Sequence, residues 1–293
     1  MAITGVWTAL ITPFTSDGKI DKPALYRLFQ MQLDAKISGI ILSGTTGESP
    51  TLSLEEKKDL TQEALQFFKG TQTQVGLGTG SNNTNESIRF SAWAAEQGVP
   101  LLLVVCPYYN KPSQSGLLQH FTSIADAIKN SSSEVMLYNV PGRTSISLSR
   151  QTICALSKHS HISSLKEATG DLAFDAEILH HVSSDFSVLS GDDPTFLPFL
   201  SIGGKGVVSV ASNIIPEVMV QIYDSFQSND IQTARKLFLE WIDFFKALFI
   251  EANPVPVKYL LSQKNICLPL VRQPLAPLSE ASIQVLQKFK INF

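Results

Sequence analysis

The sequence predicts an α/β fold: a (β/α)8 barrel followed by a C-terminal helical extension. Short apolar segments alternate with segments of helical periodicity, and eight such pairs are complete by about residue 227. We interpret the apolar segments as strands buried on both faces, which implies a parallel sheet covered by helices. Hydrophobic residues make up 44% of the 293 residues and charged residues 17%, so the chain has ample material for a packed core.

The first strand and helix are predicted from residue type and spacing. Val6–Phe14 is short, apolar and rich in β-branched residues, and a turn at residues 16–18 (SDG) follows it. A helix is expected next, because four apolar residues recur at helical spacing before Gly39: Leu25, Leu28, Phe29 and Leu33.

The later elements follow the same two patterns. The further predicted strands are Gly39–Ser43, Gln74–Leu77, Pro100–Cys106, Glu134–Tyr138, Ile162–Lys166, Phe186–Leu189 and Gly206–Val210. A capping box formed by Ser53 and Glu56 opens the second helix, which ends at Gly70. The other predicted helices are Thr84–Gln97, Gly116–Lys129, Ser149–His159, Ala173–Val182, Pro194–Ile202 and Pro216–Phe226.

The remainder of the chain is predicted to be mostly helical. Apolar residues keep a helical spacing between Leu237 and Leu248, and shorter helices are expected at Pro256–Gln263 and Ser279–Lys290. We therefore divide the chain into a catalytic barrel (1–227) and a helical extension packed on it (228–293). An open doubly wound sheet is the alternative fold, but such sheets usually stop at five or six strands.

Composition argues against several functional classes. Lys and Arg number 23 and Asp and Glu 26, a net charge of 23 − 26 = −3, so a nucleic-acid partner is not expected. The three cysteines are far apart, and no apolar stretch approaches 18 residues, so we expect neither a disulfide framework nor a membrane span. Met1–Thr8 lacks the pattern of a signal peptide, which favours a cytoplasmic protein.

Motifs for metals and organic cofactors are also missing from the sequence. Residues 76–80 (GLGTG) do not match the dinucleotide fingerprint, and residues 203–206 (GGKG) lack the remainder of a P-loop. None of the five histidines forms an H-E-x-x-H motif. We therefore expect no metal and no cofactor.

Polar side chains follow several predicted strands, where a (β/α)8 barrel places its active site. Residues 44–49 read GTTGES, a loop that suits a small anion, although an ordinary tight turn is the alternative. Tyr108 and Tyr109 follow the fourth strand, and a phenol there can relay protons or simply pack. The fifth strand ends at Tyr138, and Arg143 comes five residues later. Arg143 could clamp a substrate carboxylate or form a structural ion pair.

Lys166 is the strongest candidate. It ends the apolar sixth strand, so in a barrel it points into the mouth, whereas a surface lysine is the alternative. A buried amine near carbonyl-binding groups is a Schiff-base nucleophile. After the seventh and eighth strands, Gly191 could supply a backbone carbonyl and Val208 could line the pocket.

Six motifs in a fixed order make the chain similar to the 4-hydroxy-tetrahydrodipicolinate (dihydrodipicolinate) synthases, within the superfamily that includes N-acetylneuraminate lyase. They are GTTGE at 44–48, PYYN at 107–110, YNVPGRT at 138–144, KEATG at 166–170, SGDD at 190–193 and EANPVPVK at 251–258. The Thr45–Thr46 pair and Arg143 favour the synthases over the sialate lyases. The resemblance implies condensation of pyruvate with L-aspartate 4-semialdehyde in diaminopimelate and lysine biosynthesis.

The resemblance also implies a role for each candidate residue. Lys166 would form the imine with pyruvate, and protons would pass through Tyr138, Thr45 and Tyr109. The Thr45–Thr46 region would bind the pyruvate carboxylate, and Arg143 would bind the carboxylate of the second substrate. The backbone carbonyls of Gly191 and Val208 would lie near the imine. The family is usually tetrameric, a dimer of dimers in which Tyr109 crosses a subunit interface.

Lysine-inhibited relatives bind lysine at a dimer interface, and the matching positions here are Ser49, Pro50, Leu54, Lys57, Asn82, Glu86 and Tyr108. Asn82, Glu86 and Tyr108 suit a ligand with an amine and a carboxylate. Leu54 and Lys57 replace positions that often hold His or Trp, and the Lys57 ammonium would repel a cationic side chain. We therefore expect weak or absent feedback by lysine.

Three alternative functions are considered. A sister aldolase that cleaves sialate or a 2-keto-3-deoxy sugar acid would share Lys166 and the 44–48 loop. A non-catalytic barrel is disfavoured by the intact set of Lys166, Tyr138, Thr45 and Tyr109. A Rossmann-type oxidoreductase is disfavoured by the missing glycine fingerprint.

Overall fold

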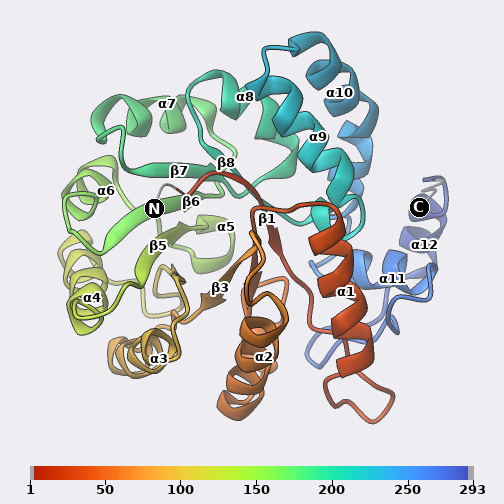
Figure 1. The fold of residues 1–293 in the computed structure, drawn as a ribbon, viewed down its shortest axis with the longest axis horizontal. Coiled ribbons are helices and arrows are strands. Elements are labelled where there is room, and N and C mark those ends of the chain that lie inside the picture. Colours follow the sequence, from red (N-terminus) through yellow and green to blue (C-terminus); the bar gives the residue numbers. More distant parts are fainter. Residues whose placement is uncertain (1–2, 290–293) are drawn as a thin grey trace. The chain divides into compact units, whose positions relative to one another are not determined.

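A computed structural model describes residues 3–289 of the chain. Its eight parallel strands follow one another in chain order around a closed barrel (Figure 1). The fold class predicted from the sequence, a (β/α)8 barrel with a C-terminal helical part, is therefore confirmed. The expectations for Met1 and for a helix end at Lys290 lie outside the described residues.

The strands lie close to their predicted positions. They are β1 (Gly5–Ala9), β2 (Gly39–Leu42), β3 (Gln74–Gly78), β4 (Leu101–Val105), β5 (Glu134–Asn139), β6 (Ile162–Glu167), β7 (Ser187–Ser190) and β8 (Gly206–Ser209). The main difference is β1, which ends at Ala9 and not at Phe14. The Ile11 N–H donates to the Asn213 side chain (3.0 Å) and not to a strand, and Pro13 has no N–H to donate.

Two compact units make up the chain, and the first contains residues 3–7 and 74–208. Its helices are α3 (Thr84–Glu96), α4 (Gln114–Ala127), α5 (Pro141–Thr144), α6 (Arg150–Leu156), α7 (Leu172–His181) and α8 (Phe196–Ser201), with a 3-10 turn η2 (Asp193–Thr195). In Figure 1, α3, α4, α6 and α7 form the outer layer beside strands β3 to β7. In the strand register, Tyr138 of β5 and Leu189 of β7 lie on either side of Lys166 of β6.

The second unit contains residues 8–73 and 209–289. Its helices are α1 (Lys22–Asp34), α2 (Leu54–Phe67), α9 (Pro216–Gln227), α10 (Ile231–Ala247), α11 (Val255–Ser262) and α12 (Glu280–Leu286), with 3-10 turns η1 (Ser49–Thr51) and η3 (Ala211–Asn213). The predicted capping box is confirmed, since the Ser53 hydroxyl accepts from Glu56 N and the Glu56 carboxylate accepts from Ser53 N. The aromatic face of α10 is buried through Phe244 and Phe245, which packs this helix into the unit.

The predicted division of the chain at residue 227, into a barrel and a helical extension, stays a prediction. No helix within residues 3–289 has the length and apolar character needed to span a membrane. Cys106, Cys154 and Cys267 are free thiols, and burial raises the pKa of Cys106 to about 12 and that of Cys267 to about 11.

Candidate active site

Lys166 lies near the carboxyl end of β6 in the first unit. Its side chain is only 5% exposed, and the ammonium lies 4.3 Å from the centre of the Tyr138 ring on β5. No carboxylate in the described part of the chain forms an ion pair with it. Buried lysines are usually paired, so an unpaired one at a strand end is the arrangement expected of a reactive amine.

Gly191 fits closely against the Lys166 side chain. A Cβ atom at position 191 would lie 2.9 Å from Lys166 Cε and 2.6 Å from the Ala168 Cβ. The Gly191 N–H donates to the Glu167 carbonyl oxygen at 2.6 Å, which fixes the turn after β7 beside the end of β6. Only glycine fits this close approach, whereas the role predicted for the Gly191 backbone carbonyl stays a prediction. Val208, in β8, is fully buried.

A set of buried carboxyl groups that the sequence analysis missed lies near the same strand end. The Glu167 carboxylate accepts from Asn139 Nδ2 and from Thr169 N, both at 2.7 Å, and burial raises its pKa. Burial, with further contributions from Glu167, Asp171 and Asp192, raises the pKa of Asp175 in α7 to about 7. Successive strand residues face opposite sides, so Glu167 faces away from Lys166.

Three other predicted residues of the first unit, Tyr108, Tyr109 and Arg143, are exposed to solvent. Tyr109 is 90% exposed and has a φ of 72°, and Tyr108 is partly exposed. Arg143 lies exposed on the short helix α5, and it forms no ion pair within residues 3–289. The structure thus brings Lys166, Tyr138 and Gly191 together, and it leaves Tyr109 and Arg143 open to solvent.

Thr45 and Thr46 lie in the second unit, in the loop that follows β2. The loop is bounded by two residues with positive φ, Ser43 at 50° and Glu48 at 57°. A Cβ at Gly47 would lie 3.1 Å from the Leu10 carbonyl oxygen, and the Gly47 carbonyl accepts from the Thr12 hydroxyl at 2.8 Å. These contacts give the loop one tight conformation, as expected of a preformed anion-binding turn.

A network from the C-terminal region holds the same loop. The buried Lys258 ammonium of α11 forms an ion pair with Glu48 and donates to the Leu270 carbonyl at 2.8 Å. It also lies 4.0 Å from the centre of the Phe14 ring. Burial lowers the pKa of Lys258, and the Glu48 carboxylate opposes that shift. Arg272 completes the network, since its backbone N–H donates to Glu48 at 2.9 Å.

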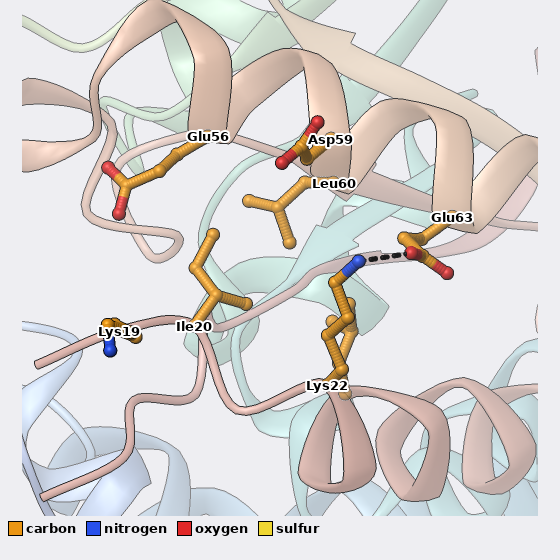
Figure 2. A pocket seen from close by; sticks show the side chains of 8 residues that line it. Lys19, Ile20, Lys22, Glu56, Asp59, Leu60 and Glu63 are labelled. Atoms are coloured by element: carbon orange, nitrogen blue, oxygen red, sulfur yellow. Dashed lines mark hydrogen bonds and ion pairs between the residues drawn. The ribbon is translucent and has the colours of Figure 1, made fainter. Parts of the chain in front are cut away.

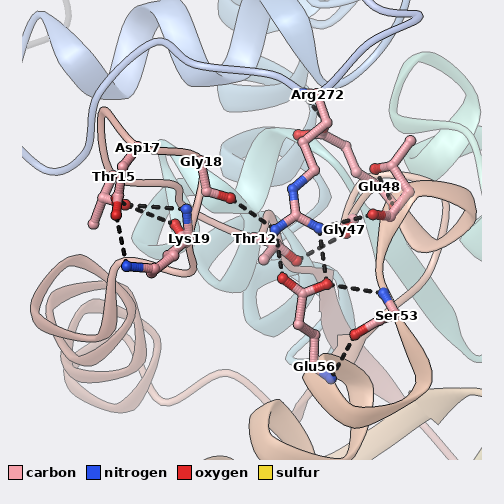
Figure 3. Close-up of polar contacts among 11 residues, drawn as sticks. Thr12, Thr15, Asp17, Gly18, Lys19, Gly47, Glu48, Ser53, Glu56 and Arg272 are labelled. Atoms are coloured by element: carbon pink, nitrogen blue, oxygen red, sulfur yellow. Dashed lines mark hydrogen bonds and ion pairs between the residues drawn. The ribbon is translucent and has the colours of Figure 1, made fainter.

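Figure 3 shows the Arg272 side chain reaching the start of α2. Its guanidinium pairs with Glu56 and donates to the carbonyl oxygens of Thr51 and Gly18, at 2.7 and 2.8 Å. This guanidinium lowers the pKa of Glu56 to about 2. In the sequence, Lys258 stands out only as the last residue of the family motif at 251–258. A lysine inside the apolar run VPVKYLL was the local signal of a buried, paired charge.

The positions predicted for an effector fall in both units. Ser49 opens η1 and its hydroxyl accepts from Ser43 at 3.2 Å. The Asn82 carbonyl accepts from Asn110 at 2.9 Å, and Glu86 lies in the first turn of α3. Leu54 is half exposed at the start of α2.

A pocket of about 270 Å³ in the second unit contains none of the predicted site residues (Figure 2). Its walls come from the start of α1 and one side of α2, and its lining residues are Lys19, Ile20, Lys22, Leu25, Glu56, Asp59, Leu60 and Glu63. Lys22 and Glu63 form an ion pair there at 2.6 Å. Within residues 3–289, no group of three or more His, Cys, Asp or Glu side chains is placed to hold a metal ion.

Comparison with known proteins gives consistent matches over nearly the whole chain. The sequence model of the Dihydrodipicolinate synthetase family matches residues 2–290. A protein of Leptospira biflexa named 4-hydroxy-tetrahydrodipicolinate synthase is 45% identical over 278 residues, which is 95% of this chain and 93% of that protein.

Solved structures show the same similarity. A dihydrodipicolinate synthase from Bacillus anthracis has a TM-score of 0.93 and 39% identity, with 98% of both chains covered. The dihydrodipicolinate synthase of Acinetobacter baumannii, solved in complex with pyruvate, has a TM-score of 0.94 and 35% identity over 98% of this chain and 97% of that one.

Proposed function

Because the chain belongs to the Dihydrodipicolinate synthetase family, we propose that it condenses pyruvate with L-aspartate 4-semialdehyde to give 4-hydroxy-tetrahydrodipicolinate. This reaction serves diaminopimelate and lysine biosynthesis. The enzyme is a class I lyase, which works through a Schiff base on a lysine.

Lys166 carries the chemistry. Its amine attacks the ketone carbon of pyruvate, and loss of water gives a protonated imine. The imine withdraws electrons, so a proton leaves C3 of pyruvate and an enamine forms. The enamine carbon bonds to the aldehyde carbon of the semialdehyde. The amino group of the product then attacks the imine carbon, which closes the ring and releases Lys166.

The surrounding residues bind the substrates and move protons. Tyr138, Thr45 and Tyr109 relay protons between the imine, the aldehyde oxygen and solvent. Thr45 and Thr46 bind the pyruvate carboxylate, and Arg143 binds the carboxylate of the semialdehyde. The Arg143 guanidinium is exposed, as suits a substrate that binds after pyruvate. The Tyr109 phenol is exposed, as suits a group that a second subunit covers to complete the site.

The environment of Lys166 is the observation that carries this proposal. Among residues 3–289, two lysines are buried and differ in their partners. Lys258 forms an ion pair with Glu48, whereas Lys166 lies beside the Tyr138 ring and has no carboxylate partner in the same residues. A carboxylate partner would keep an amine engaged in an ion pair, and Lys166 has none among residues 3–289.

Assembly and location are part of the same proposal. We expect a homotetramer, since Tyr109 is 90% exposed on a single chain and would be covered by a neighbouring subunit. Three free cysteines are consistent with the reducing cytoplasm. The helical extension, residues 228–293, would remain packed on the barrel of residues 1–227.

The test is reductive trapping. Incubation with pyruvate and borohydride should give a stable adduct, and peptide mass spectrometry should map it to Lys166. Lys166→Arg should abolish trapping and nearly all turnover, because a guanidinium keeps its charge. Lys205→Arg, at the residue just before β8, is the matched control and should trap normally. An adduct on Lys205 or Lys258 would contradict the assignment, and pyruvate release from N-acetylneuraminate would favour the sister aldolase.

A further inference from the structure

Asn253, in the connection between α10 and α11, makes a buried contact with the anion-binding loop. The side chain is 5% exposed, and its Nδ2 donates to the Thr46 hydroxyl oxygen at 2.9 Å. Thr46 is itself only 2% exposed. The Asn253 Oδ1 is buried and has no hydrogen-bond partner among residues 3–289. The two residues are 207 positions apart, so no local motif links them.

The direction of this hydrogen bond determines what Thr46 can do. A hydroxyl has one proton to donate and also accepts hydrogen bonds. Because Asn253 occupies the Thr46 oxygen as a donor, the Thr46 proton must point to another group. Within residues 3–289 the Thr46 hydroxyl donates to no acceptor. A carboxylate only accepts hydrogen bonds, so it matches this remaining donor.

The backbone of the loop does not depend on Asn253. The Ser49 N–H donates to the Gly44 carbonyl, and the Gly47 carbonyl accepts from Thr12. Glu48 is held separately by Lys258 and by the Arg272 N–H (Figure 3 shows the Arg272 contact). The Asn253 contact therefore acts on one side chain of the loop and leaves its fold to other groups.

We infer that Asn253 is a positioning residue whose side-chain amide fixes the Thr46 hydroxyl as a hydrogen-bond donor to the substrate carboxylate. This inference rests on the proposed function, which assigns pyruvate to the loop. It adds a residue that never touches the substrate and acts through Thr46 alone.

The experiment measures the pyruvate concentration that gives half-maximal borohydride trapping on Lys166, together with both steady-state KM values. Asn253→Ala should raise the half-maximal pyruvate concentration about tenfold, equivalent to loss of one hydrogen bond to a charged group of ~1.4 kcal/mol. Trapping at saturating pyruvate and the KM for the semialdehyde should stay within twofold of the parent. If the substitution loosened the structure in general, the KM values for both substrates and the melting temperature would all change.

Three further variants distinguish a role through Thr46 from other effects of the substitution. Asn253→Asp preserves volume but accepts the Thr46 proton, so it should raise the half-maximal concentration more than Asn253→Ala does. Asn130→Asp, on an exposed turn, controls for an added charge and should behave as the parent. In a Thr46→Val background, Asn253→Ala should have no additional effect.

The outcomes separate the inference from the proposed function. No trapping in the parent protein overturns the proposed function itself. Normal trapping in the parent with unchanged pyruvate dependence in Asn253→Ala and Asn253→Asp overturns only the positioning role. A full Asn253→Ala effect in the Thr46→Val background also overturns it, because Asn253 would then act by another route.

Discussion

Replacement of Lys258 by methionine should destabilise the protein strongly. Methionine keeps most of the volume but removes the ammonium, which is buried against Glu48, the Leu270 carbonyl and the Phe14 ring. Glu48 would then keep only the Arg272 N–H bond at 2.9 Å. Breaking one side of a buried ion pair leaves an uncompensated charge and costs about 3–5 kcal/mol.

The double variant tests the reason for that loss. Glu48→Gln combined with Lys258→Met removes both charges, and replacement of a whole buried pair by neutral groups is often close to neutral. We expect the free energy of unfolding of the double variant to lie within about 2 kcal/mol of that of the parent. The free energy of unfolding of each single variant should be well below that of the parent. The coupling energy between the two positions should thus be several kcal/mol.

Urea denaturation followed by tryptophan fluorescence measures these free energies. Lys22→Met is the matched control, since it breaks an exposed pair with Glu63 at 2.6 Å and should cost no more than about 1 kcal/mol. Equal losses for Lys22→Met and Lys258→Met would refute the reasoning. Additive losses in the double variant would refute it as well, because they would show that the charges do not depend on each other.

Three other predictions concern binding, regulation and pH. Arg143→Ala should raise the KM for the semialdehyde about 10- to 100-fold, or lower turnover by the same factor, because a charged hydrogen bond contributes about 1.5–3 kcal/mol. Pyruvate trapping should stay intact. Loss of trapping with normal semialdehyde kinetics would show the role to be wrong. Assays with added L-lysine should show little inhibition, because Leu54 offers no polar group and the Lys57 ammonium repels a cationic ligand; strong inhibition at sub-millimolar lysine would contradict this. Burial next to Glu167 raises the pKa of Asp175 from 3.8 to about 7, so the folded protein holds a proton that the unfolded chain releases, and stability should fall as pH rises from about 4 to 7. Asp175→Asn should remove this slope, which at 1.36 kcal/mol per pH unit amounts to at most about 4 kcal/mol, and an unchanged slope in urea denaturation would count against it.

Local patterns were sufficient to predict most elements and the position of Lys166 near the end of β6, whereas its role as nucleophile stays a prediction. The Ser53–Glu56 capping box and the lysine at the end of β6 depend on neighbours in sequence, and both lie where they were predicted. The end of β1 could not be predicted, because the Asn213 side chain, 202 residues away, takes the Ile11 N–H.

The supporting groups of the site depend on tertiary contacts and were missed for the same reason. Asn253 reaches Thr46 and Lys258 reaches Glu48 only after the chain has folded. Asp175 looks like an ordinary polar residue of a helix, and its raised pKa comes from burial beside other carboxyl groups. Residue type and spacing carry no information about such long-range partners.

The pairing of Glu48 with Lys258 has a consequence for synthesis on the ribosome. The two residues are 210 positions apart, and at 5–20 residues per second translation takes roughly 10–40 s to cover that distance. During this interval Glu48 has emerged but its counter-charge does not yet exist. The second unit is assembled from residues 8–73 and 209–289. Residues 8–73 can therefore complete their packing only after residues 209–289 have been synthesised. We therefore expect the nascent chain to need protection by chaperones until its last helices are made.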